Sequence, residues 1–183
     1  RDYFTYQQPA EISFSFMWLI WALVFLLVLV ILGVFLKRFL TKKKQADIFL
    51  KNRSISRIVE NLSGLDFEIW VQQLFLSLGA KARVTPSQGD HGIDVIVEFA
   101  NQKIAVQCKK YYGNKLVGEP MLRDLYGVKA AGGFDRVILI TTGNFTREAL
   151  QWAKDKKDLI LINAKLLEGI IMLGLRTQTL ALR

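Results

Sequence analysis

The chain has 183 residues, of which 51% are hydrophobic and 22% charged, and its formal net charge is +9. This length allows one sizeable domain plus an additional segment, and the hydrophobic fraction is high for a soluble protein. The single cysteine, Cys108, excludes an internal disulfide and is typical of a reducing compartment.

The excess of apolar residues lies in one segment near the N-terminus. Residues 16–36, FMWLIWALVFLLVLVILGVFL, contain no charged side chain, and a helix of this length at ~1.5 Å per residue spans roughly 31 Å, the thickness of the hydrocarbon core. We therefore expect one transmembrane helix over residues 14–36. A cleaved signal peptide is the alternative, but its apolar core is shorter and ends at small residues, whereas this run ends at Lys37 and Arg38.

Most of the positive charge directly follows this segment. Residues 37–57 contain eight basic side chains and one acidic side chain, whereas residues 58–183 contain 16 basic and 13 acidic side chains. Such a cluster stays in the cytoplasm and is attracted by anionic lipid head groups, so it gives little support to DNA binding. We expect a single-pass protein of the cytoplasmic (inner) membrane, with residues 1–13 outside, a basic juxtamembrane linker over 37–60, and the rest of the chain in the cytoplasm.

A folded domain is expected over residues 61–175, with a C-terminal tail over 176–183. Its first helix can be capped by Ser63 or Asp66 and ends at Gly79, and its apolar residues recur at helical spacing: Phe67, Trp70, Val71, Leu74, Phe75 and Leu78. The pattern then predicts a strand over 80–86, a hairpin over 93–109, a helix over 121–131, a strand over 135–143, a helix over 145–157, a strand over 159–163 and a helix over 165–173. Strands separated by helices imply parallel crossovers, whereas the hairpin is antiparallel. The sum is an α/β fold with a mixed sheet and helices on both faces.

The hairpin carries polar side chains at one end. If Asn101 and Gln102 form a two-residue turn, the apolar residues of both strands share one face, and Asp94 lies opposite Lys109 on the other face, close to Gln107. A surface salt bridge between Asp94 and Lys109 would explain this pattern without any function.

The same residues suit the hydrolysis of a phosphodiester bond. Mg²⁺, or Mn²⁺ in its place, prefers oxygen ligands, and Asp94 offers a carboxylate, Gln107 an amide oxygen and Cys108 a backbone carbonyl. Lys109 can orient or help deprotonate the attacking water and offset charge on the phosphate. Glycines 89 and 92 allow the backbone to turn tightly before Asp94.

The order of these segments resembles the catalytic domain of the Mrr-like type IV restriction endonucleases, within the PD-(D/E)xK nuclease superfamily. The resemblance covers roughly residues 60–173 and rests on LDFEIWVQQLFLSLGAKARVTPSQGDHGIDVIVEF, IAVQCKKY, DRVILITTGNFTREALQWA and LILINAKLLEGI. It implies a restriction-endonuclease-like fold with an αβββαβ core, a metal-binding aspartate at Asp94, a second-motif residue at Gln107, a catalytic lysine at Lys109 and a helix acid at Glu68 that helps to build the metal site. Gln107 departs from the superfamily's commoner glutamate, which leaves more of the metal affinity to Glu68 and Asp94.

Two other polar residues have weaker claims. Asp90 could lie near the metal, but capping or turn formation also explains it. His91, the only histidine, could act as a general base, but an exposed position in a turn explains it better, because the lysine mechanism does not require it.

Double-stranded DNA is the partner that this site implies. We expect contacts from the residues that follow the catalytic strand and from a strand-to-helix turn: Lys110, Tyr111, Tyr112, Lys115, Arg123, Thr142 and Asn144. Cleavage of both strands would need two active sites, which is compatible with a homodimer, but the span lacks a GxxxG pattern and gives that idea no support.

The sequence therefore predicts a membrane-anchored, Mg²⁺-dependent DNA endonuclease that restricts foreign or modified DNA. The alternative is a catalytically silent, nuclease-like module that binds or senses DNA at the membrane. A purely structural membrane protein is a third reading, which predicts neither DNA nor metal binding.

Overall fold

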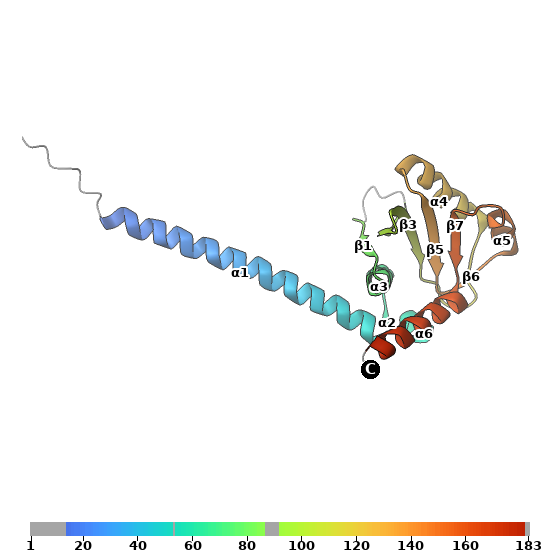
Figure 1. Ribbon diagram of the computed structural model, residues 1–183, viewed down its shortest axis with the longest axis horizontal. Helices are drawn as coiled ribbons and strands as arrows, with labels where there is room; N and C mark the ends of the chain where they lie inside the picture. Colours follow the sequence, from blue (N-terminus) through green and yellow to red (C-terminus); the bar gives the residue numbers. More distant parts are fainter. Residues whose placement is uncertain (1–13, 53, 87–91, 182–183) are drawn as a thin grey trace, which may run out of the picture. The chain divides into compact units, whose positions relative to one another are not determined.

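The computed structural model of the chain describes residues 14–52, 54–86 and 92–181 (Figure 1). Asp90 and His91 therefore lie outside the described residues. The chain divides into two compact units, Arg1–Lys43 and Lys44–Arg183.

The first unit consists of most of helix α1, Phe14–Lys51. Within the described residues, one segment is long and apolar enough to cross a membrane, Met17–Gln45, with a mean hydropathy of 3.2, and its most apolar window is fully exposed. Length and composition alone do not separate a membrane span from a signal sequence near the N-terminus. The helix extends beyond the predicted end of the span at residue 36, so that the first part of the predicted basic linker is helical.

The second unit begins with the end of α1 and two further helices, α2, Ile55–Asn61, and α3, Gly64–Ser77. Ser63 caps α3: its hydroxyl accepts a hydrogen bond from the Asp66 backbone N–H at 3.1 Å, and the Asp66 carboxylate accepts one from the Ser63 backbone N–H at 3.2 Å. This reciprocal capping box satisfies two N–H groups at the helix start. Gly79 follows the helix with a φ of +84°, as the sequence predicts.

Five strands form a mixed sheet in the order β1-β2-β3-β5-β7. They are β1, Lys81–Val84; β2, Val95–Phe99; β3, Gln102–Lys109; β5, Arg136–Thr141; and β7, Leu159–Ile162. β1, β2 and β3 pair antiparallel, whereas β3, β5 and β7 pair parallel. The predicted mixed α/β fold is therefore confirmed.

Three helices complete the unit: α4, Glu119–Gly132; α5, Arg147–Ala153; and α6, Ala164–Ala181. Gly133 ends α4 in the left-handed conformation, with a φ of +63°. α6 continues through much of the predicted C-terminal tail. A second, two-stranded sheet of β4, Leu116–Val117, and β6, Asn144–Phe145, is too short for the sequence pattern to predict.

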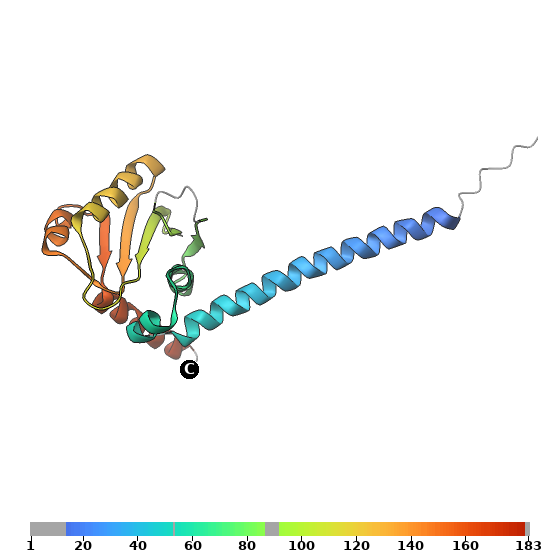
Figure 2. The ribbon, with the colours of Figure 1, turned by 180° about the vertical axis from the view of Figure 1, so that it is seen from behind.

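The helices cover both faces of the five-stranded sheet (Figure 2). On one face, residues of α2, α3 and α6 pack against alternating strand residues such as Val95, Val97 and Val106. On the other face, residues of α4 and α5 pack against Ala105 and Leu139. This alternation is what places successive residues of β3 in different surroundings.

The predicted linker over 37–60 needs a correction near its end. Ile58 of α2 is fully buried, and Phe49 and Ile55 pack against the same core. The Phe49 ring lies 5.6 Å from that of Trp70, centroid to centroid. This part of the chain therefore belongs to the folded unit rather than to a solvated connector.

The predicted register of the hairpin is wrong by two residues. Val95 pairs with Val106 and Phe99 with Gln102, so the turn is formed by Ala100 and Asn101, both with positive φ. Two consecutive residues of this kind are typical of the type I′ turns that match the twist of a hairpin. A shift of two residues keeps every side chain on its predicted face, because the side-chain period of a strand is two.

Candidate active site

Asp94 directly precedes β2, and hydrogen bonds of both its backbone and its carboxylate fix its position. Its N–H donates to the Val106 carbonyl at 2.9 Å, and its carbonyl accepts from the Thr85 N–H at 3.0 Å. Because Val95 is also the partner of Val106, two residues of one strand share one partner, which is the arrangement of a β-bulge. Bulges redirect a side chain at a strand end, and here the bulge places the Asp94 carboxylate at the neighbouring strand.

The partner of that carboxylate is the backbone of β3. Asp94 Oδ2 accepts a hydrogen bond from the Cys108 N–H at 2.6 Å. Sequence reasoning placed Asp94 opposite Lys109, but the structure anchors the carboxylate on the residue before it. A carboxylate has two oxygens and about four lone-pair sites, so this hydrogen bond does not prevent Asp94 from also serving as a metal ligand.

Gln107 provides a buried oxygen at the same end of the hairpin. Its side chain is only 8% exposed, and among the described residues its Oε1 atom has no hydrogen-bond partner. A buried acceptor without a partner is costly. An oxygen that is short of a partner beside a carboxylate suits a hard cation with oxygen ligands, so the residues present fit the metal that the sequence predicts.

Gly92 makes room for the Gln107 amide. Its φ is +83°, and a Cβ atom at this position would lie 2.8 Å from Gln107 Nε2. The sequence predicts a tight backbone turn here, and the structure adds that the backbone closely approaches a side chain of the candidate site.

Three charged groups surround Cys108. Burial raises the pKa of the Cys108 thiol well above its ordinary value, the carboxylates of Asp94 and Glu68 raise it further, and Lys109 lowers it. The thiol is therefore protonated, and its place in the apolar core agrees with a packing role rather than a nucleophilic one. Glu68 of α3 is half-buried. Its effect on the Cys108 pKa shows that its carboxylate lies within electrostatic range of the end of β3.

Lys109 ends β3 on the same face as Gln107, because the two are separated by one residue in the strand. Its backbone carbonyl accepts hydrogen bonds from Thr141 Oγ1 at 2.8 Å and from the Thr142 N–H at 3.2 Å. The parallel neighbour β5 therefore fixes the backbone that carries the predicted catalytic lysine. Sequence reasoning did not single out Thr141 for this role, and two threonines after a buried apolar strand were the available signal.

Thr142 was predicted to contact DNA, and the structure gives its hydroxyl two backbone partners. Thr142 Oγ1 accepts from the Tyr111 N–H at 2.7 Å and donates to the Tyr111 carbonyl at 3.0 Å, and the side chain is 7% exposed. These bonds tie the loop after β3 to the turn after β5, so Thr142 positions the loop whatever else it contacts.

The other predicted DNA-contacting residues occupy two places. In the loop after β3, Lys110 contacts the hydroxyl of the exposed Tyr112 and lies over its ring, and Lys115 lies over the ring of Tyr111. Arg123 is on α4, where Glu119 binds its guanidinium at 2.8 Å and 2.5 Å.

Asn144 begins β6, and its Oδ1 accepts from Asn163 Nδ2 at 2.7 Å. The loop and this turn lie at the site end of β3, whereas Arg123 is held by its own helix.

Among the described residues, no group of three or more histidine, cysteine, aspartate or glutamate side chains could hold a metal ion. Glu68 and Asp94 are the carboxylates that the prediction names, so a cation would depend on amide and backbone oxygens as well. The described part of the chain does not include Asp90 or His91, and their predicted roles stay predictions.

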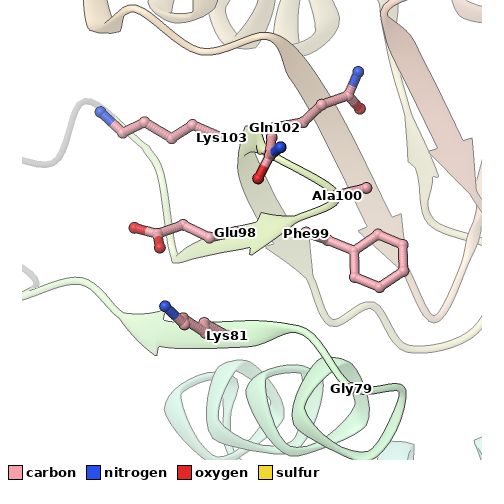
Figure 3. A pocket seen from close by; sticks show the side chains of 8 residues that line it. Gly79, Lys81, Glu98, Phe99, Ala100, Gln102 and Lys103 are labelled. Atoms are coloured by element: carbon pink, nitrogen blue, oxygen red, sulfur yellow. The ribbon is translucent and has the colours of Figure 1, made fainter.

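A hollow of about 500 Å³ lies at the other end of the hairpin. It is lined by Gly79, Lys81 and residues 98–103 (Figure 3). None of the predicted catalytic residues borders it.

Two solved structures share this fold: a restriction endonuclease and a protein of unknown function. The DNA modification-dependent restriction endonuclease AspBHI superposes with a TM-score of 0.52 at 24% identity, covering 73% of this chain and 36% of that chain. A protein of unknown function, AF1548, superposes with a TM-score of 0.51 at 18% identity, covering 57% of this chain and 65% of that one. These likenesses define a restriction-endonuclease-like fold.

The family follows from the sequence comparison. Residues 59–171 match the restriction endonuclease family of Mrr catalytic domains, and the chain belongs to that family. It is also 29% identical over 134 residues to the type IV methyl-directed restriction enzyme EcoKMrr of Escherichia coli (strain K12), covering 67% of this chain and 43% of that protein. The chain thus spans less than half the length of this relative. The family match confirms the predicted resemblance to Mrr-like catalytic domains.

Proposed function

We propose that this protein is a metal-dependent DNA endonuclease, anchored in a membrane, that hydrolyses phosphodiester bonds in foreign or modified DNA. The observation that carries the proposal is the contact at the end of the hairpin, where Asp94 Oδ2 accepts from the Cys108 N–H at 2.6 Å between Gln107 and Lys109. Membership of the restriction endonuclease family supports the same reading.

Glu68, Asp94, Gln107 and the backbone carbonyl of Cys108 would hold the cation, Mg²⁺ or Mn²⁺. A divalent cation at such a site polarises a phosphoryl oxygen and lowers the pKa of a bound water. The buried Gln107 Oε1, which has no partner within the described residues, would gain one. Asp94 keeps its orientation through the Cys108 N–H, so its carboxylate is fixed before any ligand binds.

Lys109 acts on the phosphate and on the attacking water. Its Nζ donates to a non-bridging phosphate oxygen and offsets the negative charge that develops there, and it orients the attacking water or helps to deprotonate it. The two hydrogen bonds from Thr141 and Thr142 to its carbonyl hold this lysine at the strand end. DNA would approach along the loop that carries Lys110, Tyr112 and Lys115, whose cations and ring faces suit phosphate and base contacts.

Cleavage of a supercoiled plasmid by the purified full chain tests the proposal. We expect nicking with Mg²⁺ or Mn²⁺, none with EDTA, and none with Asp94→Asn or Lys109→Met, each of which should retain its circular dichroism spectrum. Methylated and unmethylated plasmids are compared to test the preference for modified DNA. Cleavage in EDTA, or full cleavage by Asp94→Asn, would contradict the assigned site.

One observation favours a second candidate, a silent module that binds or senses DNA. The described residues contain no group of three or more histidine, cysteine, aspartate or glutamate side chains that could hold a metal ion. A silent module need not bind a cation, and its DNA affinity should survive Asp94→Ala. Titration calorimetry with Mn²⁺ separates the two candidates, because only the nuclease requires a binding signal that Asp94→Ala removes.

Membrane anchoring is supported by the exposed apolar segment Met17–Gln45 and the basic residues that follow residue 36. We place the N-terminus outside and the folded unit in the cytoplasm, with Lys42, Lys43 and Lys44 at anionic head groups. Protease treatment of spheroplasts should leave the folded unit intact, and digestion of that unit from outside would reverse the orientation. A homodimer remains a prediction, to be tested by cross-linking.

A further inference from the structure

One part of the five-stranded sheet carries basic side chains on an open face. α4 and α5 cover one face of the sheet over β5 and β7. On the same face, side chains of β1 and β2 remain accessible: Lys81, Arg83 and Glu98 are exposed, as is Lys103 of β3. Two hollows follow this surface, the one at the hairpin turn and a second of about 240 Å³ lined by Lys81, Ala82, Arg83, Ile96 and Glu98.

The strand register orders these side chains into rows. Lys81, Glu98 and Lys103 are direct neighbours across three strands and form one row. Arg83 pairs with Ile96 two residues further along the strands, in the next row on the same face. Figure 3 shows the carboxylate of Glu98 between the amino groups of Lys81 and Lys103. At ~3.3 Å per residue, rows on one face are about 7 Å apart.

The rows of this face continue along the sheet towards the candidate active site, but the open part lies over β1 and β2, because Ala105 and Gln107 of β3 are buried. Lys103, Ala105 and Gln107 alternate along β3 and share a face, so the Lys103 row lies about 13 Å from Gln107, with the Arg83 row between. Duplex DNA rises ~3.4 Å per base pair. The basic rows therefore match phosphates roughly two and four base pairs from a phosphate held at Gln107 and Lys109.

The charge of this surface is not neutralised by ion pairs. Three basic side chains accompany one acid, Glu98, and none of these four side chains forms an ion pair within 4.0 Å among the described residues. Lys103 Nζ lies 4.5 Å from the centroid of the Phe134 ring and donates to the Gly132 carbonyl at 3.5 Å, and these contacts hold the amino group near the turn between α4 and β5. Exposed cations without ion-pair partners are what phosphate contacts require.

We propose that Lys81, Arg83 and Lys103 bind the phosphates of the DNA duplex flanking the bond to be cleaved, with Glu98 weakening that contact. The assignment rests on the proposed endonuclease function, because its position is defined relative to the Asp94 site. These residues position the duplex and do not touch the reacting phosphate.

The test uses the full chain in nanodiscs of neutral phosphatidylcholine, with fluorescent duplex DNA and with EDTA to prevent hydrolysis. The affinity is measured over a series of salt concentrations for wild type, Lys81→Gln with Arg83→Gln, and Glu98→Gln. Lys154→Gln is the matched control, an exposed lysine at the end of α5, beside the opposite edge of the sheet.

We expect the double variant to bind less tightly and its plot of log affinity against log salt to be less steep by about 0.9 for each lost phosphate contact. Glu98→Gln should bind more tightly than wild type, and Lys154→Gln should match wild type. If the salt slope of the double variant equals that of wild type, or if Lys154→Gln lowers the slope by the same amount, the assignment is overturned. The endonuclease proposal would still stand.

Two further results would also overturn it. Absence of duplex binding by wild type would remove both this assignment and the proposed function. Loss of binding to anionic vesicles in the double variant, with DNA binding intact, would assign the surface to a lipid bilayer instead.

Discussion

The two ends of the β2–β3 hairpin are built from similar residues but in opposite ways. At the site end, Asp94 is fixed by hydrogen bonds to Val106, Thr85 and Cys108, and Gln107 is buried against Gly92. At the turn end, Glu98, Ala100 and Asn101 are exposed. A carboxylate at one end is held in place by backbone groups, and a carboxylate on the same strand at the other end meets solvent. Local backbone contacts, more than residue type, distinguish a candidate active site from a charged surface.

The largest effect should come from Asp94→Asn, with Glu98→Gln at the other end of the hairpin as its control. Asp94→Asn keeps an oxygen that can accept from the Cys108 N–H but removes the charge that a cation needs, so cleavage should fall by at least about 10²-fold, more than the loss of an outer-shell partner typically causes. Glu98→Gln should leave the turnover rate on saturating DNA unchanged. Plasmid nicking assays measure both, and equal losses in the two variants would remove the contrast between the ends.

Gly92→Ala should damage both stability and activity. The left-handed φ of +83° alone costs about 1–2 kcal/mol for a residue with a Cβ, and the new Cβ would also displace the Gln107 amide, 2.8 Å away. Gly113→Ala is the matched control, since its φ is +58° but nothing lies within 4 Å of the added Cβ. Urea unfolding should show a loss for both and a larger one for Gly92→Ala, and only Gly92→Ala should also lose cleavage.

Thr142→Val tests whether the turn after the neighbouring strand β5 helps to fix the site end of the hairpin. The change keeps the shape of the side chain but removes the hydrogen bonds to the N–H and carbonyl of Tyr111. At about 1 kcal/mol for each hydrogen bond, unfolding free energy should fall by about 2 kcal/mol. Because the loop after Lys109 would loosen, the variant should also show more rapid amide exchange at Tyr111, and unchanged exchange there would contradict the positioning role.

The smallest effect is expected at the turn and has the opposite sign. Ala100 has a φ of +49°, which costs about 1–2 kcal/mol for a residue with a Cβ, whereas glycine adds roughly 0.5–1 kcal/mol of unfolded-state entropy. Ala100→Gly should therefore stabilise the fold by about 0.5 kcal/mol, without changing cleavage. Thermal unfolding compared with Gly92→Ala measures this contrast, and a loss of stability at Ala100 would place the turn elsewhere.

The sequence predicts the elements well because apolar periodicity records which face of each helix and strand is buried. Trp70 and Val71 mark the core face of α3, and Val95 and Val97 that of β2. The register of the hairpin is harder, since a slip of two residues preserves every face. Only the positive φ of Ala100 and Asn101 distinguishes the two pairings, and alanine gives no local signal for it.

The supporting contacts of the candidate site were beyond sequence reasoning for a different reason. Thr141 and Lys109 are 32 residues apart in the chain, and the bulge at Asp94 follows from backbone hydrogen bonds rather than from side-chain pattern. Ile58 was missed because α2 has only seven residues, too few to show a helical period. Residue types predict the candidate site, and tertiary contacts hold its side chains in place.

Plasmid nicking by wild type and Asp94→Asn in Mg²⁺, side by side with EDTA, tests the central claim most directly. The account predicts nicking by wild type alone and only with the metal. Nicking by Asp94→Asn at the wild-type rate, with its fold confirmed, would contradict the assignment of the hairpin end as the active site.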